Sequence, residues 1–315
     1  IMLVLNYHKV RNYLSDPQSV SVSIDNFYDQ MEYLSSKYKI ITINQLLRLE
    51  KEDLVNHYIA ITFDDGYQDN YENAIPILKE FNIPAIFYVI SSFVNTNLLI
   101  GSDILDLCLL QKKNLPDHFH LDYKDYNKKW EINDEIDLKW KVNKKSKSKS
   151  LRQKIYLDIH NMLKQFPFEK QKIVIDKIIE WSGIDELKFN NYKFMNDKTL
   201  TIINNDDIFN IGCHGSTHSV LSNFTYNEQF DDIYKGKMMI QDTIGEKVNH
   251  FAYPYGQKNH YNKHTIDILK KCSFLSSVTT NMGCYVAKAS QYEIPRLTVR
   301  DWNIENFIKK INNLL

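Results

Sequence analysis

The chain has 315 residues, 43% of them hydrophobic, which is enough to bury a large core or to carry a substantial insertion. Lysine plus arginine and aspartate plus glutamate both total 39, so no global charge attracts an anionic membrane or nucleic acid, and nucleic acid is excluded as an expected partner. The apolar start, residues 1–5, is too short for a signal-peptide core or a membrane span. We therefore expect a buried strand there and no membrane span.

The cysteines are scattered without any C-x-x-C pair, which is typical of thiols in a reducing compartment. We therefore expect buried, inert thiols and a cytoplasmic location. The four are Cys108, Cys213, Cys272 and Cys284.

After the opening strand, the first third of the chain alternates helical and strand patterns. The expected elements are a helix over residues 24–34, a second helix around 46–49, a strand over 58–63, a helix over 70–81 and a strand over 84–90. Strand, helix and strand in succession predict a parallel βαβ arrangement.

The same alternation returns after a strand expected over residues 208–211. Thr225 and Glu228 have the spacing of a capping box, which predicts a helix that runs toward Gly245. Further short strands are expected over residues 251–253, 274–278 and 294–299. Both ends of the chain are therefore expected to build one α/β layer.

Residues 102–197 are richer in charged and aromatic residues than either end, with a lysine-rich stretch at 141–149 and helical periodicity around 155–181. We interpret them as a largely helical insertion within a single domain that spans residues 1–315. The insertion is a candidate substrate lid, because it joins strand ends on the face where barrel enzymes bind ligands. A separate stabilising subdomain is the alternative, and the lysine-rich stretch is interpreted as a solvated loop.

Two adjacent carboxylates, Asp64 and Asp65, follow the strand expected over 58–63 and precede Gly66. The exit of a buried strand is where α/β enzymes place functional groups, and a glycine lets the backbone turn sharply. Taken alone, Asp-Asp-Gly is more often a simple turn.

Two imidazoles, His214 and His218, follow the strand expected over 208–211. Their spacing of four residues in a helix or tight turn would place both rings on one side, within reach of one cation. Surface histidines at chance spacing are the alternative. Carboxylates after one strand and paired imidazoles after another favour an Asp-His-His metal site with positions left for water and substrate.

Three segments resemble, in the same order, the polysaccharide deacetylase family, the NodB-type carbohydrate esterases. They are TFDDGY at residues 62–67, the H-x-x-x-H at 214–218 and FAYPYG at 251–256. YHKV at 7–10 and EIPRLTV at 293–299 are similar to the branch of this family that includes the poly-N-acetylglucosamine deacetylases. The resemblance covers about residues 3–92 and 208–299 and leaves the insertion unmatched.

The resemblance implies a distorted parallel (β/α) barrel of the NodB deacetylase type, with the site at the C-terminal ends of its strands. Carried over by position, Asp64 becomes the general base. One divalent metal ion, expected to be Zn²⁺, would be bound by Asp65, His214 and His218.

The third segment implies an oxyanion site, in which Tyr255 offers its backbone N–H between Pro254 and Gly256. The implied substrate is an N-acetylated amino sugar of a glycan or glycan precursor, and the implied reaction is metal-dependent hydrolysis of its N-acetyl group in surface-polysaccharide biosynthesis. A carbohydrate-binding protein that has lost turnover is one alternative. A deformylase or O-deacetylase is another.

Two positions depart from the family pattern. Ala252 stands where many members carry an arginine that orients the base, and we expect Arg296 to replace it. The late leucine-x-histidine motif, which usually supplies the general acid in this family, is also absent, because residues 294–300 contain no histidine. We therefore place the acid on His8, which follows the first strand, with hydrogen-bonded capping of that strand end as its alternative role.

Overall fold

The computed structural model describes residues 2–50, 57–123, 126–132, 135–142, 150–287 and 289–315. The chain divides into two compact units. The sheet unit consists of Ile1–Asn12, Val20–Asn97 and Phe194–Leu315, and the insertion unit consists of Tyr13–Ser19 and Leu98–Lys193. No helix in the described residues is both long and apolar enough to cross a membrane.

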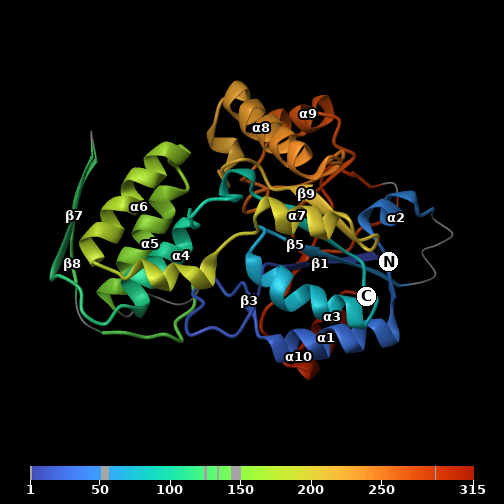
Figure 1. The fold of residues 1–315 in the computed structure, drawn as a ribbon, viewed down its shortest axis with the longest axis horizontal. Coiled ribbons are helices and arrows are strands. Elements are labelled where there is room, and N and C mark those ends of the chain that lie inside the picture. The colour runs from blue at the N-terminus through green and yellow to red at the C-terminus, as the bar shows by residue number, and fades with distance from the viewer. Residues whose placement is uncertain (1, 51–56, 124–125, 133–134, 143–149, 288) are drawn as a thin grey trace. The chain divides into compact units, whose positions relative to one another are not determined.

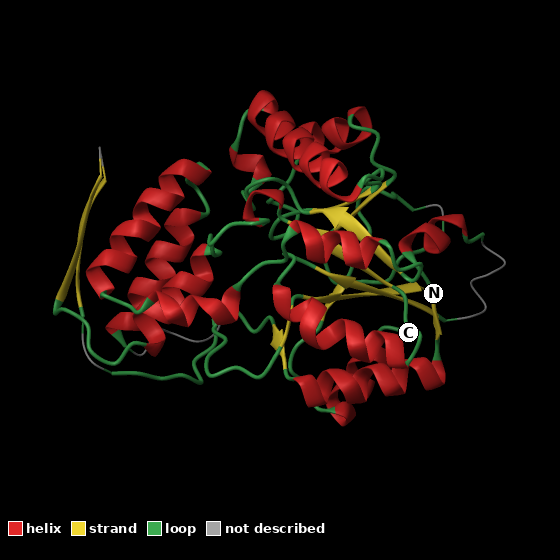
Figure 2. Ribbon diagram, viewed as in Figure 1, coloured by secondary structure: helices red, strands yellow, loops and turns green. Residues whose placement is uncertain are grey.

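A parallel sheet forms the centre of the sheet unit (Figure 2). Its strand order is β11 (Ser276–Val278), β10 (His250–Ala252), β9 (Phe209–Cys213), β6 (Ala85–Val89), β5 (Tyr58–Phe63), β1 (Met2–Tyr7) and β12 (Leu297–Thr298), with β4 (Lys39–Ile40) pairing with β5. Adjacent strands in this order pair in parallel, as the βαβ pattern predicted. The sheet curves into a half-barrel with flanking helices.

One segment of the chain joins the two ends of the half-barrel, because it contacts edge strand β11 and continues into edge strand β12. Ile294 forms an isolated parallel bridge with Val278 of β11, and three residues later Leu297 pairs with Leu5 of β1. The residues between these two contacts therefore cross the gap between the edges. Arg296 lies in this crossing segment.

Helices flank the sheet, with α1 between α3 and α10, and α8 beside α7 and α9 (Figure 1). Their bounds are α1 (Ile24–Lys37), α2 (Ile43–Arg48), α3 (Ile75–Glu80), α7 (Asp197–Asn204), α8 (Tyr226–Ile244), α9 (Lys263–Lys271) and α10 (Ile304–Asn312). The predicted capping box is present, because Thr225 accepts from the backbone N–H of Glu228 and the Glu228 carboxylate accepts from that of Thr225. A π-helical turn, Asn70–Ala74, precedes α3 within the helix expected over 70–81.

The strands present alternate side chains to two different apolar cores, as the pleat requires. Odd-numbered residues of β1 and β5 pack in the larger core together with residues of the helices, including Phe27, Leu34 and Ile240. Even-numbered residues pack in a smaller core. The smaller core consists of Met2, Val4, Ile41, Ile43, Leu46, Tyr58, Ala60, Ile86, Tyr88, Ala252, Val278, Tyr285, Ala287 and Ile294. Asn6, Thr62 and Asp64 continue the even-numbered series, so polar groups follow apolar ones on this side of the sheet.

The insertion unit contains helices and one hairpin. Its elements are α4 (Gly101–Leu105), the π-helical turn Asp106–Gln111, β7 (His118–Tyr123), β8 (Tyr126–Glu131), α5 (Leu151–Leu163), α6 (Phe168–Ser182) and a 3-10 segment Glu186–Tyr192. The sequence pattern did not predict the antiparallel pair β7–β8, in which Phe119 and Trp130 face each other and stack. Of the lysine-rich stretch, residues 143–149 lie outside the described residues.

Candidate active site

Asp65, His214 and His218 converge at the C-terminal ends of β5 and β9. The Asp65 Oδ1 atom lies 3.4 Å from His214 Nε2 and 3.4 Å from His218 Nε2, and the two rings are 5.1 Å apart at their centroids. One ligand atom from each residue lies within 4.8 Å of the other two. The structure therefore brings together the three residues that the sequence analysis assigned to a metal.

The geometry of these three groups fits a bound cation. Asp65 Oδ1 is buried and accepts no hydrogen bond from the described residues, although an unpaired buried carboxylate oxygen is costly. The Asp65 oxygen lies 3.4 Å from each imidazole nitrogen, a separation that suits two ligand atoms of one divalent cation. A cation among the three would satisfy the orphaned oxygen.

The backbone carbonyl of Ala252 fixes the orientation of His214. His214 Nδ1 lies 2.8 Å from this oxygen, and since a carbonyl only accepts, Nδ1 must donate. In the neutral ring Nε2 is then the atom with a free lone pair, directed at Asp65. Ala252, which stands where many family members carry an arginine, therefore orients the predicted metal ligand His214 through its backbone carbonyl.

Asp64 lies beside this cluster but has different partners. Arg296 donates to both of its oxygens, at 2.8 Å to Oδ1 and 2.6 Å to Oδ2, and Asn6 Nδ2 donates to Oδ2 at 3.1 Å. Arg296 also donates to Thr62 Oγ1 and to the carbonyl oxygen of Thr279, and its side chain is fully buried. The guanidinium therefore reaches Asp64 from the crossing segment, whereas the family arginine would come from the position of Ala252.

Burial and neighbouring charges shift the pKa values of the two carboxylates and the two imidazoles in the site. Burial alone would raise the pKa of both aspartates, but Arg296 and His214 hold the pKa of Asp64 below its usual range, and the imidazoles do the same for Asp65. Burial lowers the pKa of His218 to about 4. The pKa of His214 is raised, because Asp64 and Asp65 outweigh the effect of its burial. A metal ligand must be the neutral ring, so a bound cation would act against this rise in the pKa of His214.

His8 follows β1 and faces the same cluster. Its Nδ1 atom is buried without a hydrogen-bond partner among the described residues, so the structure shows no capping hydrogen bond from this atom. Burial lowers the pKa of His8, although the charges of Asp65 and Asp64 act in the opposite direction. The neutral ring is therefore favoured at neutral pH before substrate binds.

The third motif places Tyr255 next to the second imidazole, with ring centroids 4.7 Å apart. Gly256 has a φ of +66°, and a Cβ there would lie 2.7 Å from the backbone nitrogen of Thr280, so no other residue fits without a shift. Pro254, which precedes Tyr255, accepts a 2.7 Å hydrogen bond from the Gly256 N–H. The turn is thus fixed on both sides of Tyr255.

Unusual backbone conformations coincide with the predicted site. Asp65, His218 and Tyr255 have positive φ values of 75°, 56° and 61°. Each such conformation costs about 1–2 kcal/mol for a residue with a side chain, and it persists only where surrounding contacts impose it. Such strain is common at functional sites, which supports the assignment of these residues.

Helix α8 holds the loop that carries both imidazoles. The Asp232 carboxylate accepts from the backbone N–H groups of Ser216 and Thr217 and from Thr217 Oγ1, at 2.6–3.1 Å. Gly236 lets the loop approach, because a Cβ there would lie 2.8 Å from the carbonyl carbon of Gly215. Burial raises the pKa of Asp232 despite these hydrogen bonds.

The sequence analysis did not identify Asn6, Thr62 or Asp232. Asn6 and Thr62 had a detectable signal, since each is a polar residue two positions before a site residue in an apolar strand. Asp232 had none, because an acidic residue on a helix is ordinarily solvated.

The profile of the family described as "Polysaccharide deacetylase" matches residues 51–138 and 177–275, more than half of the chain. The chain belongs to the polysaccharide deacetylase family. The resemblance stated on three motifs is therefore confirmed, and so is the interpretation of the chain as a hydrolase of this family.

Named relatives of this deacetylase carry a more specific description. A "Poly-beta-1,6-N-acetyl-D-glucosamine N-deacetylase" of Staphylococcus aureus (strain MSSA476) is 29% identical over 322 residues, which cover 98% of this chain and 82% of that protein. A protein of the same name from Staphylococcus epidermidis is 31% identical over 133 residues, which cover 37% of this chain and 44% of that protein.

Solved structures of similar fold are also deacetylases. Streptococcus pyogenes deacetylase PplD, in complex with acetate, aligns with a TM-score of 0.60 at 15% identity, over 98% of this chain and 96% of that one. IcaB from Ammonifex degensii aligns with a TM-score of 0.57 at 15% identity, over 99% and 95%. At this identity the likeness shows the fold, and it confirms the NodB-type α/β prediction.

Proposed function

We propose that this deacetylase removes N-acetyl groups from poly-β-1,6-N-acetyl-D-glucosamine during the assembly of a surface polysaccharide. One observation carries the proposal: two adjacent buried aspartates have separate partners, Asp65 facing two imidazoles and Asp64 held by a guanidinium. A metal-assisted hydrolase needs this division between a ligand and a base. The polymer comes from the printed names of the staphylococcal relatives.

The proposed metal is Zn²⁺, held by Asp65, His214 and His218. One carboxylate and two imidazoles are a nitrogen and oxygen donor set that suits zinc and leaves positions open. When bound, such an ion acts as a Lewis acid on the amide carbonyl and lowers the pKa of its water toward about 7.

In the proposed reaction Asp64 takes a proton from the attacking water. Arg296 keeps Asp64 ionised at neutral pH and, with Asn6, fixes its orientation. The backbone N–H of Tyr255 donates to the oxygen on which negative charge develops. The positive φ of Tyr255 and the constrained turn at Gly256 set the direction of that N–H in advance.

The departing nitrogen needs a proton, and we assign its transfer to His8. The ring is neutral at rest, so it must gain this proton within the reacting complex. The products are acetate and a free amine on the sugar. Access of the polymer through the insertion, residues 102–197, stays a prediction, which replacement of the insertion by a short linker tests through a change of substrate preference.

The function is tested with zinc-loaded protein and N-acetylated β-1,6-linked oligosaccharides, quantifying acetate and free amine together. The wild type should release both in equal amounts. Asp64→Asn should keep its metal and lose at least about 10² in turnover, whereas Asp65→Ala should lose the metal.

Other outcomes distinguish the alternatives. Oligosaccharide binding without acetate would mark a carbohydrate-binding protein. Release of acetate without free amine would mark an O-deacetylase. Metal loss in Asp64→Asn but not in Asp65→Asn would mean that Asp64 is the metal ligand and Asp65 the base.

A further inference from the structure

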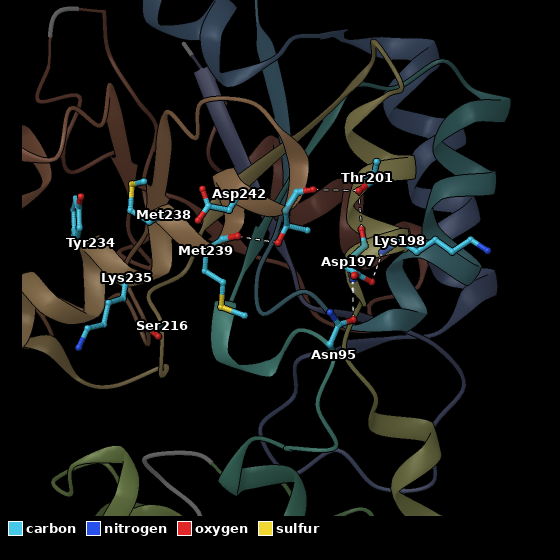
Figure 3. Close-up of a pocket in the computed structure, with 11 residues that line it drawn as sticks. Asn95, Asp197, Lys198, Thr201, Ser216, Tyr234, Lys235, Met238, Met239 and Asp242 are labelled. Carbon is cyan, nitrogen blue, oxygen red and sulfur yellow. Dashed lines mark hydrogen bonds between the residues drawn. The ribbon is translucent and has the colours of Figure 1, made fainter.

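A cavity of about 870 Å³ lies in the sheet unit between α7 and α8 (Figure 3). Six of its lining residues carry the argument: Asn95, Asp197, Ser216, Tyr234, Met239 and Asp242. Figure 3 shows the α8 side chains on one side, with Asn95 and Asp197 on the other. We call this cavity the α7–α8 groove.

One end of the groove is formed by the loops that carry the active site. Ser216 lies between the two imidazole residues in sequence, and its carbonyl oxygen accepts from the backbone N–H of Ser92, in the loop that leads from β6 to Asn95. Asp232, one helical turn before Gly236, ties the same loop to α8. A ligand in the groove would therefore contact the outer side of the loop that holds His214 and His218.

The groove has exposed apolar surface and acidic groups together. Tyr234 and Met239 are 46% and 41% exposed, although both are large side chains. The carboxylate of Asp242 makes no hydrogen bond or ion pair within the described part of the chain, and the carboxylate of Asp197 accepts there only from the backbone N–H of Lys198. Aromatic surface beside carboxylates and an amide suits a sugar ring that carries hydroxyls and a positive charge.

The two lysines at the groove do not neutralise it. Lys235 pairs with Asp231 at 3.6 Å, and Lys198 extends away from α8 (Figure 3). Asp242 and Asp197 are thus left to face a cationic ligand.

We propose that the α7–α8 groove binds glucosamine units that already carry free amines, in the same polymer strand whose acetylated units enter the active site. This inference rests on the proposed function, which creates those amines next to remaining N-acetyl groups. The ammonium groups meet Asp197 and Asp242, and sugar rings pack on Tyr234. The enzyme then retains the polymer after each cleavage and favours long, partly deacetylated chains over short ones.

The test measures binding to the full chain carrying Asp64→Asn, so that no turnover occurs. The probes are a β-1,6-linked glucosamine hexasaccharide and its fully N-acetylated counterpart, titrated calorimetrically. The glucosamine form should bind more tightly. Asp242→Asn and Tyr234→Ala should each weaken it about threefold and together about tenfold. Asp267→Asn, an exposed aspartate on α9, is the matched control and should change nothing.

Equal binding of the glucosamine form to the double variant and to its parent would overturn the proposal. So would an Asp242→Asn effect of the same size on both probes, because the carboxylate would then not recognise the amine. Failure of the proposed function is separate: it is absence of acetate release by the wild type, measured independently of this binding.

Discussion

The ion pair between Arg296 and Asp64 offers the sharpest test of the site's electrostatics, and Arg296→Met is the perturbation. The arginine is fully buried and Asp64 is 1% exposed, so the methionine side chain would replace the guanidinium without letting solvent reach the carboxylate. Among the described residues, only Asn6 Nδ2, at 3.1 Å, would then remain as a side-chain donor to Asp64. Removing one partner of a buried ion pair costs about 3–5 kcal/mol, and we expect that loss of unfolding free energy at pH 8.

The loss should depend on pH in a direction that the pair fixes. In the wild type the pKa of Asp64 is depressed, so its stabilising effect is present above the unfolded value near 3.9 and is lost as pH falls through the folded pKa. In Arg296→Met burial should raise the folded pKa above the unfolded one. The folded variant then binds the extra proton, and its stability should fall as pH rises. It should therefore be less destabilised at pH 5 than at pH 8.

The assay is urea unfolding read from hydrogen exchange of amides in β1 and β5, because the chain has two compact units and these amides report on the sheet unit. Arg296→Met combined with Asp64→Asn should recover most of the loss, with a coupling energy of at least about 2 kcal/mol. Arg48→Met, at an exposed arginine, should stay within about 0.5 kcal/mol of the wild type. Additive effects of the two site substitutions would refute the reasoning.

Three further predictions concern the site and the sheet that carries it. His8→Ala should retain metal and lower turnover by about 10² to 10⁴ with a flattened alkaline limb of the pH profile, and an unchanged rate and profile would remove His8 from catalysis. Asp232→Ala should weaken metal affinity by about 10- to 100-fold, measured by competition with a chelator. Asp231→Ala, at an exposed residue, is the control and should leave the affinity unchanged. Equal affinities of the two variants would mean that the loop holds its shape without α8. Burial lowers the pKa of His250 from 6.5 to about 4. The folded chain should therefore lose up to about 3 kcal/mol of stability as pH falls from 6.5 to 4, because the unfolded chain binds this proton first. In a series of unfolding curves at different pH, His250→Gln should flatten this dependence.

Local sequence patterns predicted much of the fold because strand alternation and helix capping depend on residues that are close in sequence. The strand expected over residues 58–63 matches β5, and the capping box of Thr225 and Glu228 begins α8 where predicted. The hairpin β7–β8 was not predicted, because its alternation of buried and exposed residues lies within a charged stretch that resembles solvated loop. Register and strand order depend on contacts between distant residues, so no local pattern contained them.

The site was predictable where sequence neighbours are also neighbours in space. Asp64 and Asp65 share one turn, and His214 and His218 share one loop. The contacts of Asn6 with Asp64, and of Asp232 with the loop at Ser216, join residues 58 and 16 positions apart. The sequence marks Asn6 only as a polar residue in an apolar strand and does not identify its partner, so each contact became visible only once the strands and α8 were placed.

The arginine beside the base comes from position 296 instead of position 252, and this shift shows which property of the arginine the site requires. A base needs its carboxylate ionised and held, and this depends on where the guanidinium nitrogens lie rather than on which strand supplies them. β10 and the crossing segment both border β11, since Val278 pairs with Ala252 on one side and with Ile294 on the other. A side chain two residues beyond Ile294 thus reaches Asp64 across the gap between the sheet edges. In return, the arginine's hydrogen bonds to Thr62 on β5 and Thr279 after β11 join the two sides of that gap. Arg296 therefore connects closure of the half-barrel to orientation of the base, and its loss should disturb both together.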